Sequence, residues 1–306
     1  MSFKTAEKTT DYSAPVLGGF LLLAIFGKLI FMINFVFFGT DEFAVTILEE
    51  LKSSDLSPKL IVTTPDSPKG RKLVLTPPPV KLWAQENGID CVDDLKSSKL
   101  QASPFDLFIV ASYGKILPRT VLGIPKHGTL NIHPSLLPKY RGAAPLQSAI
   151  LNGDTETGVS IILLDEQMDH GPILDVRKLD LGIKNFSFTE LRDELALRGA
   201  HLLTNILPEY LSGKLKPTEQ DHSQATYTKK ITKELGLLNL ADSPELNDRK
   251  IRALNPNPGT YLIDDNSKRV KVLSAHLDNN QLIFDRVIPE GKKEMDWESY
   301  KRGLTK

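Results

Sequence analysis

The chain has 306 residues, of which 41% are hydrophobic and 25% charged, which excludes a disordered, collagen-like or coiled-coil protein. Its 38 basic and 38 acidic side chains give a net charge of zero, so no bulk field attracts nucleic acid or anionic lipid. Any polyanionic partner must therefore bind a local basic patch. The single cysteine, Cys91, excludes an internal disulfide and a multi-cysteine zinc site, and favours a reducing, cytoplasmic setting.

Residues 1–31 form an N-terminal extension whose second half, 16–31, is almost entirely apolar. The apolar run continues to Phe38 and is long enough to span a bilayer, but Lys28 interrupts it. Met32 stands where the first methionine of a domain is expected. Three interpretations stay open for this extension: a non-native or misassigned start, a membrane anchor through residues 16–31, and a helix packed on the protein. A signal peptide fits poorly, because the leading segment is long and mixed in charge.

Short apolar runs alternate with helical patterns over residues 32–213, which predicts one α/β domain with a parallel sheet covered by helices. The predicted strands are Ile33–Phe38, Lys59–Thr64, Leu107–Ala111, Thr129–His133 and Val159–Leu164. Two predicted helices, at 42–51 and 144–152, have the spacing of crossover helices. A third begins with a capping box of Ser187 and Glu190 and closes the domain near Gly213, with Pro208 marking a kink or an early stop.

Residues 214–226 contain almost no apolar side chain and are predicted to be a linker. The last segment, 227–306, is too short for a large core. It combines a helical stretch at 246–254 with strand-like runs at 259–263, 270–275 and 281–284. These patterns predict a small β-rich second domain.

The densest group of reactive side chains lies around the fourth predicted strand. The two-residue period of a strand places Asn131 and His133 on one side and Leu130 and Ile132 on the other. An amide and an imidazole therefore meet at the carboxyl end of a parallel strand, where open α/β sheets bind ligands. Taken alone, this short pattern also fits a strand end whose polar residues satisfy a turn.

The longer context resembles the formyltransferases that use 10-formyltetrahydrofolate. The similar segments are Asn131–Gly142 with Ala143-Ala144-Pro145, Gly158–Ser160 and Met168–Gly171, then Phe38–Ala44, Ala111–Pro118 and Ile251–Pro256. The resemblance covers 32–306 and implies a Rossmann-like catalytic domain followed by a small OB-like domain. Within the family, the motifs are most similar to the branch that formylates methionyl-initiator tRNA. That resemblance implies a folate co-substrate, no metal, a cytoplasmic monomer and no stable protein partner.

The resemblance assigns catalysis to Asn131, His133 and Asp169. An amine that attacks a formyl carbon builds an oxyanion beside a developing ammonium, so the site needs hydrogen-bond donors and a proton acceptor. Asn131 supplies a donor, protonated His133 a charged donor, and Asp169 favours the imidazolium and helps to take the amine proton. His170 is expected to be a bystander.

The resemblance also assigns a folate site to four consecutive residues, with 113–117 and 163–169 as pocket loops. These four residues are Ser135, Leu136, Leu137 and Pro138. In the strand-to-helix turn after Phe38, Asp41 favours helix capping and opposes phosphate, which disfavours the glycinamide ribonucleotide branch of the family.

A basic segment at 65–72 resembles the loop that the family inserts at the tRNA acceptor end. Arg71 is the strongest single candidate within it, flanked by Lys69 and Lys72, and Arg141 is a further expected tRNA contact. Each of these cations alone also fits a solvated surface, so a groove that aligns them is what tRNA binding requires.

The second domain departs from the family pattern, because the asparagine-proline segment 255–259 lacks its usual aromatic residues and the chain between 270 and 289 is short. A reduced OB-like, tRNA-binding domain at 227–306 is therefore expected. Three other functions stay open: a formyltransferase for a nucleotide-linked amino sugar, a hydrolase of 10-formyltetrahydrofolate, and a non-catalytic RNA-binding relative.

Overall fold

The fold was analysed in a computed structural model that describes residues 33–70, 72–101, 104–182 and 184–304. The three interpretations of the extension 1–31, and the role of Met32 as a domain start, lie outside the described residues. Within the described part of the chain, no helix is long and apolar enough to cross a membrane.

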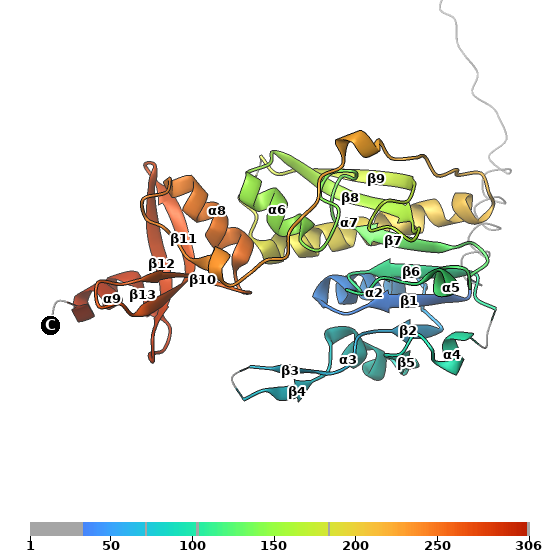
Figure 1. Cartoon of the computed structure of the whole chain (residues 1–306), viewed down its shortest axis with the longest axis horizontal. Helices are drawn as coiled ribbons and strands as arrows, with labels where there is room; N and C mark the ends of the chain where they lie inside the picture. The colour runs from blue at the N-terminus through green and yellow to red at the C-terminus, as the bar shows by residue number, and fades with distance from the viewer. Residues whose placement is uncertain (1–32, 71, 102–103, 183, 305–306) are drawn as a thin grey trace, which may run out of the picture.

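A seven-stranded sheet organises the larger unit, with strand order β5-β2-β1-β6-β7-β8-β9 (Figure 1). The strands are β1 (Phe35–Gly39), β2 (Leu60–Val62), β5 (Cys91–Val92), β6 (Leu107–Ala111), β7 (Thr129–His133), β8 (Glu156–Leu163) and β9 (Ile173–Asp180). The five neighbouring strands β5, β2, β1, β6 and β7 run parallel, which confirms the predicted α/β sheet. The parallel direction expected for Val159–Leu164 is wrong: β8 pairs with β7 in antiparallel register, with Ser160 opposite His133, and β9 extends this arrangement.

Helices cover both faces of this sheet. They are α2 (Glu42–Ser53), α3 (Pro79–Glu86), α4 (Ser98–Gln101), α5 (Arg119–Leu122), α6 (Pro145–Asn152) and α7 (Phe188–Leu211). Because β1 alternates, Phe35 and Phe37 enter one core cluster and Val36 and Phe38 enter the cluster on the opposite face. Helix α6 joins two antiparallel strands, so it is not the parallel crossover that the sequence predicted.

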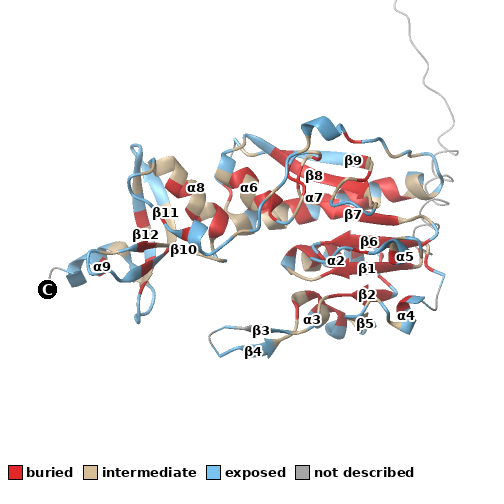
Figure 2. Cartoon of the chain, in the orientation of Figure 1, coloured by how far each residue is buried: buried red, intermediate tan, exposed pale blue. Residues whose placement is uncertain are grey.

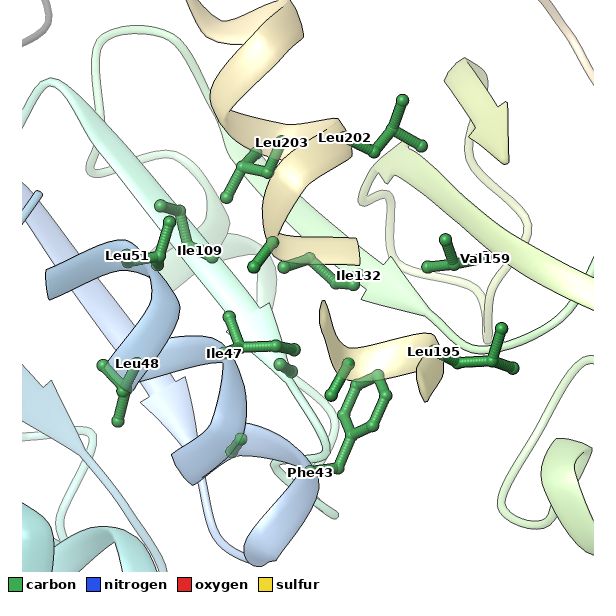
Figure 3. Close-up of a cluster of buried hydrophobic side chains, with 14 of the residues drawn as sticks. Phe43, Ile47, Leu48, Leu51, Ile109, Ile132, Val159, Leu195, Leu202 and Leu203 are labelled. Carbon is green, nitrogen blue, oxygen red and sulfur yellow. The ribbon is translucent and has the colours of Figure 1, made fainter. Parts of the chain in front are cut away.

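Helices α2 and α7 enclose the main core with the sheet (Figure 3). The capping box that begins α7 is present, with Ser187 accepting from the Glu190 N–H and the Glu190 carboxylate accepting from the Ser187 N–H. Pro208 lies within the last turn, and the helix continues to Leu211. Gly199 lets α7 approach the sheet closely, since a Cβ there would lie 2.5 Å from Cγ2 of Ile132.

A two-stranded hairpin of β3 (Ser67–Lys69) and β4 (Val74–Thr76) projects from the edge of the larger unit (Figure 1). It occupies the basic segment that the sequence predicted to be a loop. Its second strand is exposed, as is the turn residue Leu73, of which 71% is accessible (Figure 2). The described part of the hairpin is thus a solvated arm that exposes apolar side chains and Lys72.

The C-terminal unit is an antiparallel sheet of order β10-β11-β12-β13, as expected for a β-rich module. Its elements are α8 (Pro244–Leu254), β10 (Thr260–Ile263), β11 (Arg269–Asp278), β12 (Gln281–Pro289), β13 (Met295–Asp296) and α9 (Trp297–Leu304), preceded by the 3-10 turns η1 (His222–Gln224) and η2 (Glu234–Gly236). In Figure 1 it lies beside the larger unit, where α8 packs on α6. Strands β10 and β13 lie at the ends of this sheet, and an isolated bridge joins Leu237 to Tyr261 of β10.

Candidate active site

A cavity of about 400 Å³ opens at the carboxyl end of β7 and is lined by several segments. Its wall includes Asn131, His133 and Asp169 together with residues of the two loops 113–117 and 164–169. The family resemblance implies 113–117 and 163–169 as pocket loops, and residues of both line this cavity. The cavity lies in the size range of small-molecule sites, roughly 300–1,000 Å³.

Asn131 and His133 share one face of β7, while Leu130 and Ile132 enter the core on the other face. Both polar side chains are buried. The carboxylate of Asp169 lies against them, with Oδ1 3.3 Å from Asn131 Nδ2 and 3.6 Å from His133 Nδ1. The structure therefore brings the three expected catalytic side chains together.

The backbone fixes the orientation of the His133 ring. Its Nε2 lies 3.0 Å from the carbonyl oxygen of Tyr140. Because a carbonyl only accepts, Nε2 carries a proton and donates it. The other nitrogen, Nδ1, is the one that faces the carboxylate of Asp169.

Asp169 has a backbone φ of 49°, in the left-handed region that is uncommon for residues other than glycine. Its second carboxylate oxygen, Oδ2, accepts from the N–H of Gly142 at 2.8 Å. With the bond from Asn131, both oxygens accept hydrogen bonds, so the side chain is fixed beside the imidazole.

Arg141 is placed differently from the expectation that it contacts tRNA. Its side chain is 1% exposed, and its guanidinium donates to Gln220, Tyr227 and His222. Because the guanidinium is buried, the expected tRNA contact is wrong. This arginine holds neighbouring segments of the chain together instead of presenting its charge to a polyanion. His222 stacks on His170 with ring centroids 4.0 Å apart.

His170, expected to be a bystander, contacts Asp165 through Nδ1 at 2.6 Å. It contributes no atom to the cavity wall.

The four expected folate residues lie behind the cavity wall, which they do not line. Ser135 donates to the carbonyl of Lys139, and Ser160 donates to the carbonyl of Ser135 while accepting from the Leu137 N–H. Leu136 packs close to Gly158, and the bond between Leu137 and Pro138 is cis. These contacts shape the turn that carries Pro134, which does line the cavity.

Two further residues of the cavity wall, Asp41 and Tyr113, carry groups with raised pKa values. Burial raises the pKa of Asp41, although its carboxylate accepts from the Ser112 hydroxyl at 2.5 Å and from the Ala44 N–H at the start of α2. This is the capping role that the sequence predicted. Burial also raises the pKa of Tyr113 to about 12, and its hydroxyl finds no partner among the described residues.

The expected tRNA contacts on the hairpin are only partly described. Arg71 lies outside the described residues, and for Lys69 the structure gives only its backbone pairing with Val74. Lys72 is exposed in the turn. The hairpin therefore presents at least one cation to solvent.

The sequence patterns did not predict several residues of the cavity wall. Phe188 and Arg192 line the wall from the first turns of α7, and their spacing of four residues places them on one helix face. The capping box located the start of this helix but gave no signal of which face meets the cavity. Among the described residues, no group of three His, Cys, Asp or Glu side chains could hold a metal ion.

Two family models match this chain: formyl transferase over residues 32–209, and the formyl transferase C-terminal domain over 230–282. The methionyl-tRNA formyltransferase of Carboxydothermus hydrogenoformans is 38% identical over 298 residues, which cover 88% of this chain and 96% of that protein. The chain belongs to the methionyl-tRNA formyltransferases. A second member of this family, from Chloroflexus aurantiacus, is 44% identical over 74% of both chains.

Solved structures agree on the fold. The methionyl-tRNA formyltransferase from Clostridium thermocellum aligns with a TM-score of 0.56 and 19% identity, covering 84% of this chain and 99% of that one. A sugar 3N-formyl transferase, WlaRD, solved in the presence of dTDP and 5-N-formyl-THF, aligns with a TM-score of 0.61 and 19% identity over 87% of this chain and 97% of its own. Both branches of the family therefore share this architecture.

Proposed function

We propose that the protein transfers the formyl group of 10-formyltetrahydrofolate to the amino group of methionyl-initiator tRNA. The observation that carries this proposal is the convergence of Asn131, His133 and Asp169 in one cavity, in a chain that belongs to the methionyl-tRNA formyltransferases. We also propose that the enzyme is a cytoplasmic monomer. It would then act on tRNA made in the same compartment.

The three side chains suit amine formylation. As the amine nitrogen bonds to the formyl carbon, the formyl oxygen becomes negative and accepts hydrogen bonds from Asn131 Nδ2–H and from protonated His133 Nδ1. Asp169 stabilises that imidazolium across 3.6 Å and helps to accept the proton that the amine loses, directly or through water. When the bond from the formyl carbon to the folate nitrogen breaks, a proton returns to that nitrogen.

The cavity fits a folate donor in size and in the character of its wall. The loop 113–117 contributes apolar side chains, while the loop 164–169 contributes Asp165 and Glu166. A pterin ring offers donors and acceptors on its edge and two flat faces, which this combination complements. We propose this cavity, with Ser135–Pro138 as its supporting turn, as the folate site.

For tRNA, we propose the hairpin arm with Lys69, Arg71 and Lys72 as one contact and the module at 227–306 as the second. Phosphate contacts supply most of the affinity for nucleic acid, so a neutral chain needs its cations on one projecting element. Arg141 is excluded from this set, because its guanidinium is buried and engaged within the protein.

The decisive experiment is a formylation assay with the purified protein, 10-formyltetrahydrofolate and methionyl-initiator tRNA. We expect formyl-methionyl-tRNA as the product. A dTDP-linked amino sugar in place of the tRNA is the control acceptor, and a reaction without acceptor controls for hydrolysis of the donor. Formylation of the sugar alone, or donor hydrolysis alone, would contradict the proposed acceptor.

A further inference from the structure

Gln220 lies on the connection between α7 and the C-terminal unit, a segment that the sequence predicted to be a plain linker. Its side chain is only 5% exposed. The Nε2 amide donates to the carbonyl oxygens of Asp169 at 2.9 Å and Gly171 at 2.7 Å. Its Oε1 accepts from Arg141 Nη2 at 2.6 Å and Nε at 3.2 Å. Two donors and two lone pairs are all that an amide has, so this side chain is fully bonded.

The bond to Asp169 acts on a strained position. A non-glycine residue with a φ of 49° is held there by its surroundings at a cost of about 1–3 kcal/mol. Gln220 supports the backbone on both sides of His170, through the carbonyls of Asp169 and Gly171. Without these bonds the loop can relax toward an ordinary backbone conformation, which rotates the carboxylate of Asp169 away from His133.

The connection that carries Gln220 also fixes the loop of Gly142, whose N–H binds the Asp169 carboxylate. Thr226 accepts from the Arg141 N–H through its carbonyl at 2.8 Å, and the Thr228 N–H donates to the Arg141 carbonyl at 2.8 Å. Arg141 is followed directly by Gly142, whose N–H binds Asp169 Oδ2. The connection therefore fixes both the loop that carries the carboxylate and the loop that receives it.

From this geometry we infer that Gln220, anchored by the buried Arg141, is a positioning residue for formyl transfer that acts through Asp169. The inference rests on the proposed function, since it assigns a role within that reaction. Gln220 contributes no atom to the cavity wall, so its effect reaches the substrates only through the loop that it holds. A positioning role predicts a loss in kcat with little change in either KM.

The test compares full-length Gln220→Leu, which removes all four hydrogen bonds, with Gln220→Glu, which keeps an acceptor for Arg141 but loses both donors. Gln224→Leu is the matched control, because Gln224 lies on the same segment and is exposed, and its side chain bonds only to Ser223 among the described residues. Each variant is assayed for formylation of methionyl-initiator tRNA, and its thermal unfolding is measured. The Gln220 substitutions are also placed in an Asp169→Asn background.

We expect both Gln220 variants to lose about tenfold or more in kcat, since misplacement of a catalytic group by about 1 Å costs rate on that scale. Both KM values should stay within about threefold of the parent, and Gln224→Leu should match it. In the Asp169→Asn background, either Gln220 variant should cost less than about threefold more, because the group that it positions is already disabled.

Parental kcat in folded Gln220→Leu or Gln220→Glu overturns the inference. So does a loss that multiplies fully with Asp169→Asn, or a failure of both variants to fold, since each makes Gln220 a structural residue only. If the unaltered protein formylates no methionyl-tRNA, the proposed function fails instead, and the two failures are thereby distinguished.

Discussion

Asp169→Asn removes the charge of the carboxylate with almost no change in the size of the side chain. The amide keeps one oxygen, which can accept from the Gly142 N–H as Asp169 Oδ2 does at 2.8 Å. What it removes is the anion that lies 3.6 Å from His133 Nδ1, and with it the acceptor for Asn131 Nδ2 at 3.3 Å. In addition, the new NH₂ group can donate to neutral His133, which favours the uncharged ring. The substitution therefore leaves the loop in place and discourages the imidazolium.

The size of the effect follows from the separation of the two charges. Two unit charges 3.6 Å apart attract by roughly 4–5 kcal/mol at an effective dielectric constant of about 20, which corresponds to about three factors of ten in rate. We therefore expect kcat to fall by about 10²- to 10³-fold, with an unfolding temperature close to that of the parent. Single-turnover formylation with labelled donor measures this loss.

The reasoning is refuted if folded Asp169→Asn transfers formyl groups within about fivefold of the parent rate. It is also refuted if the variant unfolds at a much lower temperature, because the retained Gly142 bond predicts an intact loop. A loss of rate with a preserved unfolding temperature is the only combination that the geometry allows.

Three further outcomes can be measured. Lys72→Ala should weaken tRNA binding and lower the slope of log affinity against log salt by about one, and an unchanged slope contradicts a phosphate contact. Gly199→Ala should destabilise the fold by about 1–3 kcal/mol in urea unfolding, although alanine favours helices, because its Cβ would lie 2.5 Å from Ile132 Cγ2. Hydrogen bonds from Lys184 and from the α7 cap lower the pKa of Glu190 from 4.5 to about 2. Its stabilisation is thus complete above pH 4.5 and is lost as pH falls toward 2; Glu190→Gln should remove that dependence, which solvent screening limits to about 1 kcal/mol.

The sequence predicted the strand that carries the site, because side chains in a strand alternate. That period alone placed Asn131 and His133 opposite Ile132, as the structure has them. The direction of β8 could not be predicted in the same way, because a buried apolar strand reads alike in a parallel and an antiparallel pair. Asp169 was found through the family resemblance, since no periodicity marks a loop that folds back beside an earlier strand.

The burial of the charged side chain of Arg141 could not be predicted from the sequence either. Arg141 lies beside Lys139 and Gly142 in a segment that reads as a basic surface, and its hydrogen-bond partners come about 80 residues later. Long-range pairing of this kind leaves no local pattern. The segment 214–226 is polar, as a linker is, but Gln220 within it bonds to buried groups and not to solvent.

The connection that passes behind the site sets a limit on how this protein can be recombined. A chimera that joins the catalytic unit to a foreign C-terminal module at residue 213 would replace Gln220 and the backbone of Thr226 and Thr228, which pairs with Arg141. A junction after Thr228 would keep those contacts. We therefore expect that a chimera with a foreign RNA-binding module stays active only if it keeps the linker of the catalytic unit and omits the linker of the incoming module.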